Sequence, residues 1–145
     1  MHHDEKDCVK GAISLILRLA IASLFFAAAV SKFQMGTTQV VAFFKGTFKD
    51  TWLPMWIVSL YAHIITWIEL VIALWLLSGR GLQKAWFTTA LVMVSLAFGM
   101  TVAKNIAVAG SNYFYVLMCC AGLYFSPYDC FKLGQCCGKN KESCE

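Results

Sequence analysis

Charged residues are scarce in this chain of 145 residues: Asp, Glu, Lys and Arg make up 14% of it, against about a quarter in soluble domains. Apolar residues make up 59%. This composition excludes a domain whose whole surface faces water, because helices that are apolar all round have no polar face for the solvent. The net charge of +4 forms no separate basic stripe, so we expect no nucleic-acid partner.

Histidine is also rare, which limits the cofactors that the chain could hold alone. Besides His2 and His3 at the N-terminal end, the sequence contains only His63, whereas a membrane-embedded b-type haem generally needs two axial ligands that face each other. There is no C-x-x-C-H motif for covalent haem attachment and no C-x-x-C pair for thiol exchange. The sequence therefore predicts no self-contained haem or metal site, and a haem shared with a partner chain stays open.

Cysteine, in contrast, is concentrated at one end. Six of the seven cysteines follow residue 118, and the tail spacing C-x5-C-C-x6-C matches no zinc or iron–sulfur pattern. If the tail is cytoplasmic, Cys130, Cys136 and Cys137 are predicted to be free thiols or juxtamembrane lipidation sites. On the opposite side of the membrane, disulfides would be the better interpretation.

Four long apolar stretches are each close to the length that crosses about 30 Å of hydrocarbon. They cover residues 11–33, 57–78, 85–103 and 110–125. The connections at residues 79–84 and 105–109 are short, which favours antiparallel neighbours. We predict an all-α polytopic membrane protein: one transmembrane domain over residues 1–145, a four-helix up-down bundle with a cysteine-rich tail over residues 126–145.

The connection between the first two spans is too apolar for a simple loop. Val40, Phe44, Phe48 and Trp52 recur at every fourth residue, with charged residues between them. This spacing predicts an amphipathic helix in the outer membrane interface. An irregular loop with scattered aromatic residues is the alternative.

Lysine and arginine outside the spans indicate the orientation, because cytoplasmic loops tend to carry the excess. With the N-terminus inside, the inner residues are Lys6, Lys10, Arg80, Lys84, Lys132, Lys139 and Lys141, and the outer ones are Lys32, Lys45, Lys49 and Lys104. We therefore expect an integral protein of the bacterial inner (plasma) membrane with both termini in the cytoplasm.

Two charged residues lie well inside the spans, where charges are costly and are therefore candidates for function. Arg18 lies about a third of the way along the first span and Glu69 near the middle of the second, so at 1.5 Å per residue their depths are similar. We predict a buried Arg18–Glu69 pair. It is either a structural ion pair that fixes the helix register, or a site where Glu69 binds a proton or faces a quinone.

A second polar cluster is predicted near the outer surface. Lys32 ends the first span, His63 lies about two turns into the second, and Lys104 ends the third. These residues could converge on an anion or a quinone head group. Snorkelling lysines, together with a histidine bonded to a neighbouring helix, are the alternative.

Several stretches of the sequence resemble the DoxX family of membrane proteins. They are LRLAIASLFFAAAVSKF at residues 17–33, FFKGTFKDTWLP at 43–54, and the second span with its glutamate and the turn LSGRGLQKA at 77–85. The resemblance implies a four-helix membrane fold, and relatives include a subunit of thiosulfate:quinone oxidoreductase and a methylamine-utilisation membrane protein. The chain departs from the common pattern at Ala29, where glycine is often found, and in its cysteine-rich tail.

The function predicted from these features is that of a small membrane subunit or anchor of a larger redox or electron-transfer assembly, with a quinone as the associated cofactor. Its expected partners are the lipid bilayer and other membrane subunits, because a bundle of this size offers almost no catalytic surface outside the membrane. Two alternatives stay open. One is a structural or assembly subunit without chemistry, and the other is a small independent enzyme or transporter that uses Glu69.

Overall fold

Residues 2–129, the part of the chain that the computed structural model describes, form a helical fold. The elements are α1 (His2–Met35), α2 (Thr37–Thr47), α3 (Met55–Ser78), α4 (Leu82–Val102), α5 (Ile106–Phe125) and the short 3-10 helix η1 (Ser126–Tyr128). No strand occurs within the described range. The predicted all-α class is therefore confirmed.

Four of the helices are long and apolar enough to cross a membrane, which confirms a polytopic helical membrane protein. The candidate spans are Val9–Met35, Met55–Ser78, Leu82–Val102 and Ile106–Tyr128. All four overlap the predicted stretches. The largest difference is at the start, where α1 begins at His2 rather than near residue 11, because the glutamate and lysines ahead of the apolar run are themselves good helix formers.

Glycines with a positive φ lie in two of the connections between helices. Gly36 (φ 80°) separates α1 from α2, and Gly79 and Gly81 (φ 69° and 60°) form the turn between α3 and α4. A residue with a Cβ atom loses about 1–2 kcal/mol in this conformation. The tight, glycine-containing turn expected at residues 79–84 is therefore present, and it makes α3 and α4 antiparallel.

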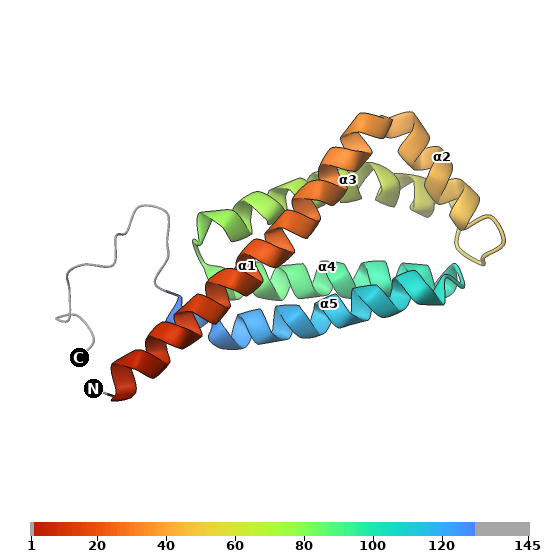
Figure 1. The fold of residues 1–145 in the computed structure, drawn as a ribbon. Helices are drawn as coiled ribbons and strands as arrows, with labels where there is room; N and C mark the ends of the chain where they lie inside the picture. The colour runs from red at the N-terminus through yellow and green to blue at the C-terminus, as the bar shows by residue number, and fades with distance from the viewer. Residues whose placement is uncertain (1, 130–145) are drawn as a thin grey trace.

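The long helices associate as two pairs (Figure 1). α1 lies across α3, and α4 lies beside α5. α3 and α4 diverge from their common turn and contact each other less extensively than each contacts its other neighbour. The start of α1 and η1 are at one end of the molecule, while α2 and the α4–α5 connection are at the other.

Apolar side chains from all four long helices make up the main core. Its buried members are Ile21, Ala22, Phe25, Ile72, Ala73, Leu76, Leu82, Ala85, Trp86, Met93 and Cys119. Large apolar side chains such as Phe26, Trp67 and Leu117 are exposed on the outside. A bundle that is apolar both inside and outside is what helices surrounded by lipid require.

The connection between α1 and α3 contains the predicted helix, α2. Val40, Phe44 and Phe48 of the expected apolar stripe are buried, whereas Trp52 is exposed. The buried side chains form a second core with Val58 and neighbouring residues of α3. The apolar face of α2 therefore packs against the protein, and this packing is what fixes the helix beside the end of α1.

Candidate functional site

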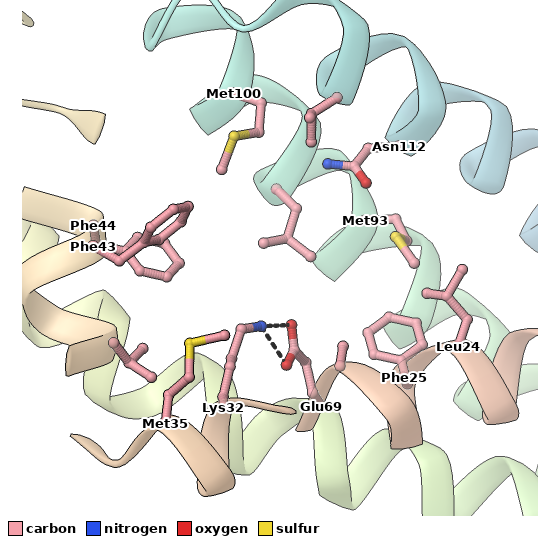
Figure 2. Close-up of a pocket in the computed structure, with 14 residues that line it drawn as sticks. Leu24, Phe25, Lys32, Met35, Phe43, Phe44, Glu69, Met93, Met100 and Asn112 are labelled. Carbon is pink, nitrogen blue, oxygen red and sulfur yellow. Dashed lines mark hydrogen bonds and ion pairs between the residues drawn. The ribbon is translucent and has the colours of Figure 1, made fainter. Parts of the chain in front are cut away.

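Glu69 of α3 is paired with Lys32 of α1, so the predicted pairing of Arg18 with Glu69 is wrong. Lys32 Nζ donates to both carboxylate oxygens, as Figure 2 shows. The side chain of Glu69 is 3% exposed and that of Lys32 is 19% exposed. Residue counting places Arg18 and Glu69 at the same depth only if both helices stand upright in the membrane. The inclination of α1 across α3 instead brings the end of α1 to the middle of α3.

Arg18 has a different partner, which the sequence reasoning missed. Arg18 Nη1 donates to Asp129 Oδ2 at 3.2 Å, and Ser14 Oγ donates to the same oxygen at 3.0 Å. Arg18 and Asp129 are each 5% exposed. The sequence contains a signal for this pairing. Asp129 is the first carboxylate after the fourth span, and it therefore lies at the same end of the bundle as the first turns of the first span.

The structure does not bring the predicted outer cluster together. Lys32 points inward to Glu69. His63 is exposed, and its Nδ1 donates to the carbonyl oxygen of Ser59 in its own helix at 2.7 Å. Lys104 is exposed in the connection between α4 and α5. Of the three residues, only Lys32 belongs to the candidate site.

A cavity of about 260 Å³ lies beside the Lys32–Glu69 pair. All five α-helices contribute to its wall, so the cavity lies between the α1–α3 pair and the α4–α5 pair. Its polar side chains are Lys32, Glu69 and Asn112, and the remainder of the lining is apolar, with aromatic rings from Phe25 and Phe44 (Figure 2). The site is therefore a mostly apolar pocket that contains an ion pair.

Asn112 is the second functional candidate that the sequence reasoning missed. It lies on α5 and faces the cavity opposite the Lys32–Glu69 pair (Figure 2). The available signal was an amide side chain inside the fourth apolar stretch, since a polar group in hydrocarbon is costly unless it is bonded.

A second cavity, of about 220 Å³, adjoins the first at Phe44, which lines both. Its wall is almost wholly apolar and includes Phe48 and Phe98. Tyr61 and Ser95 also line it, and their hydroxyl groups are 3.0 Å apart. Because its wall is apolar, this cavity can accommodate a hydrocarbon chain but offers little to a charged group.

The described residues contain no cluster of three or more His, Cys, Asp or Glu side chains that could hold a metal ion. Cys119 is buried against the core and Cys120 is exposed on the outer side of α5. The predicted thiol or lipidation sites Cys130, Cys136 and Cys137 lie outside the described residues.

Comparison with known proteins identifies a related family. The family model for methylamine utilisation protein MauE matches residues 10–124, which include the first three predicted apolar stretches and all but the last residue of the fourth. No curated protein matches the chain, and neither does any solved structure. The match identifies one of the relatives that the DoxX resemblance implied, the methylamine-utilisation membrane protein, and not DoxX itself.

Proposed function

We propose, because the chain belongs to the family of methylamine utilisation protein MauE, that it is a membrane subunit of a methylamine-utilisation electron-transfer system. In this proposal it is embedded in the bacterial inner membrane beside other membrane subunits. The Lys32–Glu69 cavity is its functional site, and a quinone that diffuses in the bilayer is the associated cofactor.

The observation that carries this proposal is the position of the Lys32–Glu69 pair on the wall of a cavity. An ion pair inside a membrane protein costs desolvation energy and is often no more stable than a well-packed apolar substitute. An ion pair that only fixed helix register would need no open space beside it, whereas here about 260 Å³ adjoins it. Charged residues that border open space inside a membrane protein are typical of ligand or proton sites.

A second candidate function, that of an assembly subunit without chemistry, is favoured by the exposure of α5. The span Ile106–Tyr128 is the least buried of the four candidate spans, and it also has the lowest mean hydropathy. Tyr113 and Tyr124 are both exposed on it. A helix of this kind is suited to contact another membrane subunit, because the neighbour could accept hydrogen bonds that lipid cannot.

Neutralising the ion pair is expected to abolish function while leaving the protein folded. In the double variant Lys32→Gln with Glu69→Gln, both charges are removed together, so no unpaired charge remains in the bundle. We expect the chain, extracted in mild detergent, to co-migrate with a multisubunit complex that contains quinone, and the double variant to carry at least about tenfold less quinone, the loss expected when charge-assisted hydrogen bonds are removed.

The matched control is Asp50→Asn, which neutralises an exposed carboxylate in the α2–α3 connection. Its quinone content and its migration should equal those of the wild type. If the double variant also retained its quinone, the cavity would not be the functional site. A complex without any quinone would instead favour the assembly function, and a chain that migrated alone would argue against both functions.

The orientation can be tested with two engineered cysteines at opposite ends of the bundle. Lys84→Cys lies just after the α3–α4 turn and Asp50→Cys in the α2–α3 connection, and both positions are exposed. In a chain whose own cysteines are replaced, a membrane-impermeant maleimide should label Asp50→Cys in spheroplasts and label Lys84→Cys only after permeabilisation. The reverse pattern would place both termini outside the cytoplasm.

A further inference from the structure

The side chain of Asn112 makes no hydrogen bond within the described part of the chain, although it lies in a membrane span. It is partly exposed, and it lines the cavity. Transfer of an unbonded amide into an apolar medium is unfavourable. Such a group on the wall of a mostly apolar pocket indicates a hydrogen-bonding partner inside the pocket.

The opposite wall also has an unused donor. The ammonium group of Lys32 has three N–H donors, and its contacts with Glu69 Oε1 and Oε2 use two of them. The pair as a whole is electrically neutral, so it does not attract an ion. Lys32 and Asn112 can therefore each donate one hydrogen bond into the same space, from opposite walls (Figure 2).

The size of the cavity limits what can lie between these donors. An apolar cavity of about 150 Å³ holds benzene, and drug-sized ligands need at least about 300 Å³. At about 260 Å³, the space suits one substituted six-membered ring. Phe25 and Phe44 on the wall are able to pack against the face or edge of such a ring.

We infer that the cavity binds an uncharged, lipid-soluble ring compound with a hydrogen-bond acceptor at each end, one bonded by Lys32 and the other by Asn112. A 1,4-benzoquinone with an apolar tail has this arrangement. The inference rests on the proposed function, because it concerns the same cavity. It adds Asn112 as a binding residue and specifies how the ring is oriented.

The test compares two ligands on wild type and on Asn112→Leu, which keeps the shape of the side chain but removes its donor. The probes are decyl-1,4-benzoquinone, which has two carbonyl oxygens, and a decyl-substituted cyclohexenone, which has one. Binding is measured by equilibrium dialysis in the same detergent throughout. Asn112→Leu should weaken the binding of the quinone about tenfold and that of the cyclohexenone less than about twofold, because the single carbonyl oxygen of the cyclohexenone can bond to Lys32.

The control variant is Ser111→Ala, which changes the adjacent residue of α5. The Ser111 hydroxyl donates to the carbonyl oxygen of Ala107 in its own helix, so both ligands should bind this variant as they bind the wild type. Equal quinone affinity in Asn112→Leu and wild type would overturn the inference while leaving the Lys32–Glu69 site in place. No binding of the quinone to the wild type would overturn both this inference and the proposed quinone site.

Discussion

Asp129→Ala is expected to lower the free energy of unfolding by about 3–5 kcal/mol, the loss typical of breaking a buried ion pair. The carboxylate lies 3.2 Å from Arg18 Nη1 and 3.0 Å from Ser14 Oγ. Because Arg18 is only 5% exposed, water cannot replace the lost attraction. The variant removes the carboxylate that the fold places against the buried guanidinium group.

This loss can be measured by titrating the purified protein in dodecyl maltoside with sodium dodecyl sulfate and following its helical circular dichroism. Asp50→Ala serves as the control, because Asp50 is an exposed carboxylate, and we expect its effect to stay within about 0.5 kcal/mol. Similar losses for Asp50→Ala and Asp129→Ala would contradict a special contribution from the buried pair.

A double variant distinguishes the contribution of the ion pair to stability from the cost of removing the carboxylate alone. Arg18→Met combined with Asp129→Leu removes both charges and fills their space with apolar side chains. Buried pairs replaced in this way often lose little stability, so the double variant should be more stable than Asp129→Ala. A double variant less stable than the single one would show that Arg18 has a further role in holding the fold.

The elements could be predicted from the sequence because each depends on a local pattern. The length of the apolar stretches predicted the spans, and the four-residue spacing of Val40, Phe44 and Phe48 predicted α2. Gly79 and Gly81 indicated the turn between α3 and α4. All of these signals lie within one helix or one connection, so no knowledge of how the helices cross was needed.

The pairing of Lys32 with Glu69 could not be predicted, because it depends on the angle at which α1 crosses α3. Counting residues from the membrane surface gives depth only for upright helices, and the inclination of α1 moves Lys32 to Glu69. Asp129 was missed because it lies beyond the last apolar stretch, where the chain folds back against α1. The polar residues of the site were therefore largely visible in the sequence, but their partners were not.

Gly122 of α5 lies in close contact with the indole of Trp86 of α4. A Cβ atom at Gly122 would lie 2.5 Å from Trp86 Cε2 and Cζ2, and Trp86 is 0% exposed. The glycine therefore allows the indole to lie directly against the backbone of α5. This is the close approach that small residues provide between membrane helices.

Gly122→Ala is accordingly expected to destabilise the protein by about 1–3 kcal/mol, and Gly122→Leu by more, because the added atoms would overlap a fully buried indole. Gly110→Ala is the matched control in the same helix, since a Cβ atom there meets nothing within 4 Å. It should be neutral, or stabilising by up to about 1 kcal/mol through helix propensity.

A second-site substitution tests whether the indole is the cause of this loss. Trp86→Phe shortens the ring that the new methyl group would strike, so Gly122→Ala should cost less stability in the Trp86→Phe background than in the wild type. The same detergent titration measures both steps of the cycle. A cost of Gly122→Ala that did not change with Trp86→Phe would mean that backbone strain in α5, rather than its packing on α4, accounts for the loss.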